Sequence, residues 1–150
     1  MSRSTQEAQL KQANVLLVGD STVGKTSLTK VYMGHEFVEG QNATIGMDFF
    51  KQVVRPKSAP MNQYQMNIWD TAGQERFQSL TRNFFRQSDA FIICFDLTRP
   101  DSFKSVTRWV LQIRDTAGAD APVLLIGNKV DLEEERVVTR EQADALAAEI

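Results

Sequence analysis

The stretch that decides the fold reads VLLVGDSTVGKTSL and covers residues 15–28. An apolar run leads into Gly19, and Gly24, Lys25 and Thr26 complete the pattern G-x-x-x-x-G-K-[ST]. Glycines at these places let backbone amides converge on phosphate oxygens, and the positive end of the following helix adds to the attraction. The stretch therefore predicts a buried strand, a phosphate-binding loop and a helix in succession.

The residue types in this loop predict how a nucleotide is held. Lys25 would reach the outer phosphates, and the hydroxyl of Thr26 would ligate a magnesium ion. Backbone amides along the loop would bind phosphate oxygens, so the predicted nucleotide-binding residues here are Ser21, Thr22, Val23, Gly24, Lys25, Thr26 and Ser27. A loop of this kind indicates a nucleoside triphosphate without indicating which base.

The rest of the chain alternates short apolar runs with longer amphipathic stretches. Strands are predicted at residues 14–18, 48–55, 64–69, 91–97 and 123–126. Helices are predicted at residues 25–33, 78–86, 102–116 and 140–150, the last opened by a capping box of Thr139 and Gln142. Pro56 and the residues after it predict a hairpin at one edge of the sheet. This order predicts an α/β fold, with a mostly parallel sheet covered by helices on both faces.

Composition excludes several classes of protein. The chain has 150 residues, 42% of them hydrophobic and 24% charged, which suits one globular domain and not a disordered chain. No apolar run approaches the roughly 18–20 residues that cross a bilayer. The net charge of -2 argues against nucleic-acid binding. The single cysteine, Cys94, lies in an apolar run and suits the core of a protein in a reducing compartment, so we expect a cytoplasmic location.

A second motif, Asn128-Lys129-Val130-Asp131, follows the predicted strand at 123–126. The carboxylate of Asp131 can accept hydrogen bonds from the ring N–H and the exocyclic amine of guanine, a donor pair that adenine lacks. A mismatched base would leave this carboxylate buried and unpaired, which is costly. Together with Asn128 and Lys129, Asp131 therefore predicts a guanine site. An ATPase built on the same loop is the alternative.

The segment Asp70-Thr71-Ala72-Gly73-Gln74 supplies candidates for catalysis. Asp70 would hold the magnesium ion through a water, the amide of Gly73 would bond the γ-phosphate, and Gln74 would orient the attacking water. Thr44 is a further candidate for both metal and nucleotide, with a hydroxyl that becomes available only when its loop closes. The alternative for Thr44 is a residue of high β-propensity at the start of a strand. We therefore expect Gln74 to be catalytic and Thr26, Thr44 and Asp70 to hold Mg²⁺, with GTP as substrate and GDP as product.

These motifs in this order resemble a Ras-superfamily small GTPase. The run Ile45-Gly46-Met47-Asp48-Phe49 and the run from Ile68 to Phe77 are similar to the Rab branch. The resemblance implies a P-loop NTPase three-layer sandwich with one antiparallel edge strand, in which Phe37 packs against the guanine ring. It also implies that an aromatic cluster of Phe49, Trp69 and Phe84 binds effectors. The alternative is that these three side chains belong to the core.

The resemblance covers residues 13–150. It implies a small GTPase (G) domain at 13–150 that is incomplete at its C-terminus. Residues 1–12 are mostly polar, and this composition predicts a flexible N-terminal leader. The last strand and last helix of the family, and its tail with prenylated cysteines, have no counterpart in the sequence. We therefore expect no membrane anchor in this chain, and peripheral membrane association only if such a tail is supplied.

The implied function is a molecular switch in vesicle trafficking that binds GTP and hydrolyses it slowly, because no arginine is placed by a motif to complete the site. Effectors, an exchange factor and an activating protein would bind the switch regions, and the chain would act as a monomer. The alternative is a truncated fragment that holds nucleotide weakly, does not hydrolyse GTP, and acts as a protein-interaction module.

Overall fold

The computed structural model describes residues 10–42, 44–71 and 78–150. The strands are β1 (Lys11–Val18), β2 (Met47–Val54), β3 (Tyr64–Thr71), β4 (Ala90–Asp96) and β5 (Val123–Asn128). The helices are α1 (Lys25–Tyr32), α2 (Gln78–Gln87), α3 (Pro100–Ala117) and α4 (Arg140–Glu149), with a 3-10 turn at Glu133–Glu135. In these described ranges no helix is long and apolar enough to cross a membrane.

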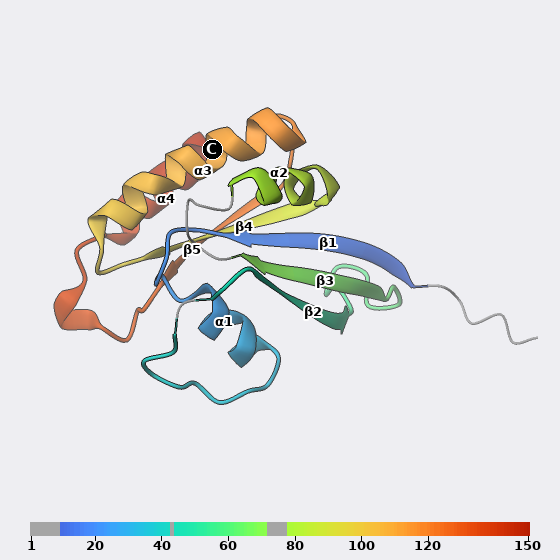
Figure 1. The fold of residues 1–150 in the computed structure, drawn as a ribbon, viewed down its shortest axis with the longest axis horizontal. Helices are drawn as coiled ribbons and strands as arrows, with labels where there is room; N and C mark the ends of the chain where they lie inside the picture. The colour runs from blue at the N-terminus through green and yellow to red at the C-terminus, as the bar shows by residue number, and fades with distance from the viewer. Residues whose placement is uncertain (1–9, 43, 72–77) are drawn as a thin grey trace, which may run out of the picture.

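The strands of the described residues form one sheet in the order β2-β3-β1-β4-β5. Helix α1 lies on one face of this sheet, and α2, α3 and α4 lie on the other (Figure 1). Strand β2 pairs antiparallel with β3, from Met47 opposite Thr71 to Val54 opposite Tyr64, while the remaining pairs are parallel. The α/β sandwich with one antiparallel edge strand is therefore confirmed.

Strand β1 begins earlier than predicted. It starts at Lys11, before the expected start at Asn14, and so takes in the end of the stretch predicted as a leader. The cause is its long pairing with β3, which begins with Lys11 opposite Tyr64. Side-chain bonds reinforce this pairing: the amide of Asn67 donates to Gln12 Oε1 at 3.2 Å and to Asn14 Oδ1 at 2.9 Å. Residues 1–9 lie outside the described residues, so the remainder of the leader stays a prediction.

Alternation along β1 builds a core on each face of the sheet. Leu16 and Val18 pack into the cluster that includes Val106 of α3, and Leu17 packs on the other face. Helix α4 covers the same face as α3 and places Leu146 against the larger cluster, and Ile150 at its C-terminal end packs there too. Its predicted capping box is confirmed: the Gln142 amide donates to Thr139 Oγ1 at 3.2 Å, and the Thr139 amide donates to Gln142 Oε1 at 2.9 Å.

Cys94 is a core thiol, with 1% of its surface exposed. Burial raises the pKa of this thiol to about 12. Since the thiolate is the reactive form, we expect iodoacetamide at pH 8 to label the folded chain roughly 10³-fold more slowly than the urea-unfolded chain. Mass spectrometry of timed samples measures both rates. Labelling of the folded chain at the unfolded rate would contradict this assignment.

Candidate nucleotide-binding site

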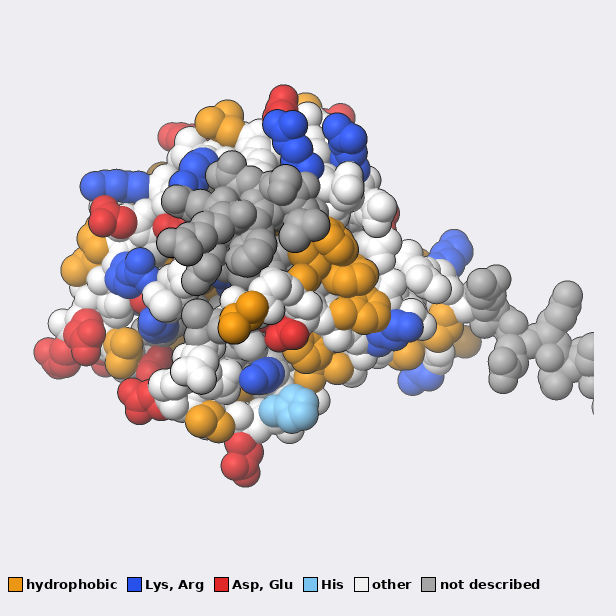
Figure 2. All heavy atoms as spheres, in the orientation of Figure 1, with side chains coloured by type: hydrophobic (Ala, Val, Ile, Leu, Met, Phe, Trp, Pro, Cys, Tyr) orange, Lys and Arg blue, Asp and Glu red, His pale blue; other side chains and the backbone are white. Residues whose placement is uncertain are grey.

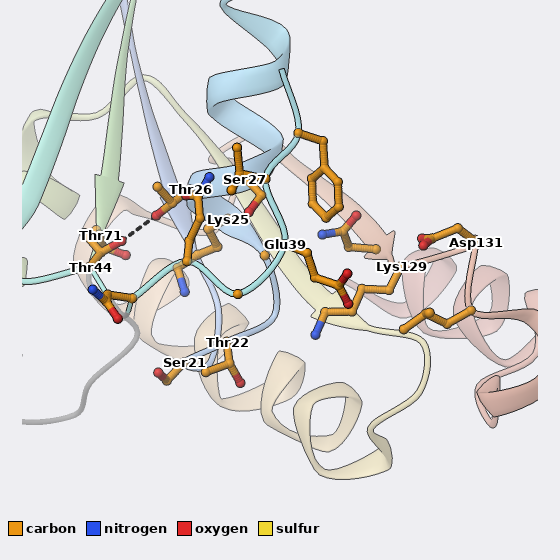
Figure 3. A pocket seen from close by; sticks show the side chains of 18 residues that line it. Ser21, Thr22, Lys25, Thr26, Ser27, Glu39, Thr44, Thr71, Lys129 and Asp131 are labelled. Carbon is orange, nitrogen blue, oxygen red and sulfur yellow. Dashed lines mark hydrogen bonds between the residues drawn. The ribbon is translucent and has the colours of Figure 1, made fainter. Parts of the chain in front are cut away.

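A cavity of about 550 Å³ brings the predicted motifs together. It is lined by the loop after β1, by residues 37–42 and Thr44 after α1, by Thr71 at the end of β3, and by the loop after β5. The predicted nucleotide-binding residues that line it are Ser21, Thr22, Gly24, Lys25, Thr26, Ser27, Phe37, Thr44, Asn128, Lys129 and Asp131. Figure 3 shows Thr26 and Thr44 toward one end of the cavity and Lys129 and Asp131 toward the other.

Val23 and Asp70 are described residues predicted for the site that do not line the cavity. The side chain of Val23 is fully buried with Leu17 and Cys94, so a contact of this residue with nucleotide goes through its backbone. Asp70 lies behind Thr26, to which it is hydrogen-bonded. Gly73 and Gln74 lie outside the described residues, so the roles given to them stay predictions.

Two glycines of the phosphate loop occupy positions that no side chain fits. Gly19 has a φ of +148°, and a Cβ there would collide with the carbonyl oxygen of Cys94. Gly24 has a φ of +97°, and a Cβ there would collide with the side-chain nitrogen of Asn128. Glycine alone takes such conformations at little cost while leaving room for the neighbour. The loop is therefore packed directly against β4 and the end of β5.

Lys25 places a cation inside the phosphate loop. Its side chain is 5% exposed, and its ammonium donates hydrogen bonds of 2.9 Å to the carbonyl oxygens of Gly19 and Asp20. Burial lowers the pKa of Lys25, while the negative charge of Asp70 acts in the opposite direction. The loop and the start of α1 together form a positive, backbone-lined pocket for anionic oxygens.

Thr26 joins the phosphate loop to two other segments. Its hydroxyl donates to Asp70 Oδ2 at 2.5 Å and lies 2.5 Å from the hydroxyl of Thr44, as the dashed line in Figure 3 marks. Asp70 is fully buried, and its Oδ1 has no hydrogen-bond partner among the described residues. Burial raises the pKa of Asp70, and the Thr26 hydrogen bond and the Lys25 charge oppose that rise.

The chemistry of this oxygen cluster fits the predicted magnesium ion. Mg²⁺ is typically held by one or two carboxylates together with waters and phosphate oxygens. Thr26, Thr44 and Asp70 supply hydroxyl and carboxylate oxygens, and the unpartnered Asp70 Oδ1 is a buried acceptor that a cation or its water would satisfy. Thr44 precedes β2, which begins at Met47, so the alternative of a strand residue is not supported.

The base end of the cavity is tied to the phosphate loop. The side-chain amide of Asn128 donates to the carbonyl oxygen of Val23 at 3.0 Å. The Lys129 ammonium lies 2.8 Å from Oδ2 of Asp96, which is fully buried at the end of β4. Burial acts to raise the pKa of Asp96, but hydrogen bonds from Lys129 and Thr98 outweigh it, so the pKa is lowered overall. Asp96 thus remains a carboxylate at neutral pH and orients Lys129 beside the cavity.

Asp131 is exposed at the rim of the cavity. The expectation from the sequence that its carboxylate is buried is therefore wrong. Its position in the loop after β5, outside the strand, is the reason. The cost of leaving its carboxylate unpaired therefore arises only when a bound base covers it. Phe37 also lines the cavity and is 66% exposed, so its ring face is accessible to a flat ligand.

The three aromatic residues proposed as an effector surface form a cluster. The ring centroids of Phe49 and Trp69 are 4.2 Å apart, and those of Trp69 and Phe84 are 5.0 Å apart. Trp69 and Phe84 also pack against the larger core cluster, whereas Phe49 is 39% exposed. Figure 2 shows apolar side chains gathered over β2 and β3, the strands that carry Phe49 and Trp69. The cluster therefore serves the core while presenting one edge to the outside.

Sequence analysis missed three residues that support the site. Asp96 is the last residue of β4, and Asp70 lies near the end of β3. The signal used for Asp70, a carboxylate at the end of a strand, could therefore have identified Asp96. Asp20 accepts hydrogen bonds of 3.1 Å from Arg108 and Trp109 of α3. Arg99 donates to Ser21 and Thr22. No local pattern marks these contacts, because they join segments far apart in the chain.

Comparison with protein families matches residues 14–150 to the Ras family. The chain is 41% identical over 146 residues to Ras-related protein Rab-19 of Mus musculus, which covers 97% of this chain and 66% of that protein. It is 41% identical over 136 residues to Ras-related protein Rab-26 of Rattus norvegicus, which covers 90% of this chain and 52% of that protein.

A further relative is EF-hand calcium-binding domain-containing protein 4B of Homo sapiens, 42% identical over 135 residues, which is 90% of this chain and 18% of that protein. The chain spans about half to two thirds of the length of the two Rab relatives. The family match takes in the phosphate loop, the metal-site residues and the guanine motif alike. The chain therefore belongs to the Ras family, within its Rab branch.

Proposed function

We propose that this chain is a GTP-binding and GTP-hydrolysing molecular switch in vesicle and membrane trafficking. The observation that carries the proposal is a single cavity with Lys25 and the Thr26–Thr44–Asp70 cluster at one end and the Asn128–Asp131 motif at the other. One end suits phosphates with a cation, and the other suits a base. Membership of the Ras family supports the same activity.

The phosphate end of the cavity would bind the negative charge of the nucleotide mainly through donors that are already in position. Amides of residues 21–27 and the Lys25 ammonium would bind the phosphate oxygens of GTP or GDP. Thr26, Thr44 and Asp70 would hold a magnesium ion, which supplies charge neutralisation on the outer phosphates when bound. The buried state of Lys25 and Asp70 keeps these groups in place before the substrate arrives.

The base end would select guanine. Asp131 would accept hydrogen bonds from the ring N–H and the exocyclic amine, and Phe37 would cover one ring face. Asn128 would contribute without contacting the base, because its side chain joins the end of β5 to the phosphate loop through the hydrogen bond to Val23. Lys129, fixed by Asp96, would lie alongside the base.

Hydrolysis would depend on Gln74, which would orient water in line with the leaving group, and it would be slow without an activating protein. A partner's arginine accelerates such reactions by roughly 10³–10⁵-fold. After hydrolysis, Thr44 and Gly73 would lose their contacts with the γ-phosphate and its metal, and the two switch segments would relax. Effectors that need ordered switch segments would then dissociate.

Partners would include effectors, an exchange factor and an activating protein, bound through the switch segments and the edge of the cluster formed by Phe49, Trp69 and Phe84. We propose a monomer in the cytoplasm, with peripheral membrane association only if a C-terminal tail is supplied. The family match and the Rab relatives do not favour the alternative of a non-hydrolysing interaction module.

Competition and single-turnover assays test the activity. GDP should displace a bound fluorescent GDP at far lower concentration than ATP does, and the chain should release phosphate from GTP slowly. Gln74→Leu should bind GTP like the parent and release phosphate much more slowly, because the water is no longer oriented. Displacement by ATP at comparable concentration would contradict the guanine assignment, and unchanged phosphate release would remove the role of Gln74.

A further inference from the structure

Arg99 contacts the outer side of the phosphate loop. One terminal nitrogen of its guanidinium, Nη1, donates to the carbonyl oxygen of Ser21 at 3.0 Å and to the hydroxyl of Thr22 at 2.6 Å. Ser21 and Thr22 line the cavity, whereas Arg99 does not. The arginine therefore reaches a bound nucleotide only through these two residues.

Thr22 needs such support because of its backbone conformation. Its φ is 66°, in the left-handed region that β-branched residues rarely adopt. A residue keeps a backbone conformation in this region only where surrounding contacts impose it. The hydrogen bond from Arg99 to the Thr22 hydroxyl fixes the side chain of this strained residue, and the bond to Ser21 fixes the peptide before it.

Arg99 itself is held at a rigid turn. It lies between β4 and α3, where its amide donates to the carbonyl oxygen of Asp96 at 3.0 Å. Its carbonyl oxygen accepts from the amide of Ser102 at 3.1 Å and from the Ser102 hydroxyl at 2.7 Å, and Ser102 is buried. The following residue, Pro100, begins α3. The guanidinium therefore extends from a fixed backbone toward the loop.

The same helix holds the preceding loop residue. Asp20 Oδ1 accepts hydrogen bonds of 3.1 Å from Arg108 Nη2 and from Trp109 Nε1, both on α3. Residues 20–22 of the phosphate loop therefore all accept hydrogen bonds from side chains of α3 or of Arg99, the residue just before it.

We propose that Arg99 is a positioning residue for nucleotide binding, which holds Ser21 and Thr22 in the conformation that binds phosphate. This inference rests on the proposed function of the cavity. Because Arg99 acts through the loop and lies outside the cavity, its loss should speed nucleotide release.

The test is the release rate of fluorescent GDP from the full chain in the presence of Mg²⁺. Arg99→Ala should release GDP roughly 10- to 100-fold faster, because two hydrogen bonds from a charged donor are lost. Arg99→Lys should restore part of the parent rate, since one ammonium keeps the charge without the planar geometry of guanidinium. Lys104→Ala is the matched control, because this exposed lysine of α3 pairs with the exposed Asp101, and it should release GDP at the parent rate.

If the parent itself does not bind GDP, the proposed function fails and the role of Arg99 fails with it. If the parent binds and Arg99→Ala releases GDP at the parent rate, the role of Arg99 is overturned. Should Arg99→Ala fail to fold, as judged by circular dichroism, Thr22→Ala removes one acceptor and leaves the arginine and its turn intact. Release by Thr22→Ala at the parent rate would overturn the proposal equally.

Discussion

Asparagine in place of Asp131 is expected to weaken GDP binding by roughly 10²–10³-fold, because its amide nitrogen cannot accept one of the two hydrogen bonds from guanine and its neutral oxygen accepts the other more weakly than a carboxylate does. The asparagine amide also presents N–H donors, which suit the keto group that xanthine carries where guanine carries its exocyclic amine. Asp131→Asn should therefore bind xanthosine diphosphate more tightly than the parent does. Isothermal titration calorimetry with GDP and with xanthosine diphosphate in Mg²⁺ measures the affinity of each protein for each nucleotide.

Glu134→Gln provides the control for charge. Glu134 is an exposed carboxylate in the neighbouring 3-10 turn, outside the cavity, and its removal changes the net charge by the same amount. We expect its GDP affinity to equal that of the parent. If Asp131→Asn held GDP as tightly as the parent, the loop after β5 would not be the guanine-recognition element.

Loss of the Thr26 hydroxyl should remove the dependence of nucleotide binding on magnesium. Thr26→Ala deletes one proposed ligand and breaks the hydrogen bonds to Thr44 and Asp70. Even groups that only support a metal ligand cost roughly 10–100-fold in metal affinity when removed. We therefore expect GTP affinity in Mg²⁺ to fall by at least roughly 10²-fold, with little change in EDTA. Equilibrium binding of fluorescent GTP with and without Mg²⁺ gives both values.

Thr26→Ser keeps the hydroxyl and loses only the methyl group, so it should retain most of the magnesium effect. This comparison separates the loss of oxygen chemistry from a change in packing at the start of α1. The assignment of the metal site would be wrong if Mg²⁺ raised the GTP affinity of Thr26→Ala by the same factor as that of the parent.

Local sequence signals predicted the elements that carry the site. The phosphate loop could be predicted from its two glycines, Lys25 and Thr26 alone, because these residues lie within eight positions of one another and their roles do not depend on distant contacts. The α4 capping box was predicted for the same reason, since its two side chains contact each other three residues apart. The start of β1 was harder to predict, because pairing with β3 extends the strand into the polar residues Lys11 and Gln12.

The supporting contacts of the site could not be predicted from local patterns. Lys129 is oriented by Asp96, and Ser21 is held by Arg99, through pairings that exist only after the strands are ordered in the sheet. Asp131 was expected to be buried, but burial of a loop residue depends on what covers it and not on its own sequence. The aromatic cluster had two interpretations from sequence, and both describe part of it: Trp69 and Phe84 pack on the core, while Phe49 is exposed.

The bond between Asn128 and Val23 has a thermodynamic consequence. It spans 105 residues of sequence and fastens the two halves of the cavity to each other at a set separation. A ligand that matches this separation engages the second half at a high effective concentration once the first is bound. Guanosine and pyrophosphate as separate molecules would lack that advantage, so we expect the covalent link between base and phosphates to account for much of the affinity of the intact nucleotide.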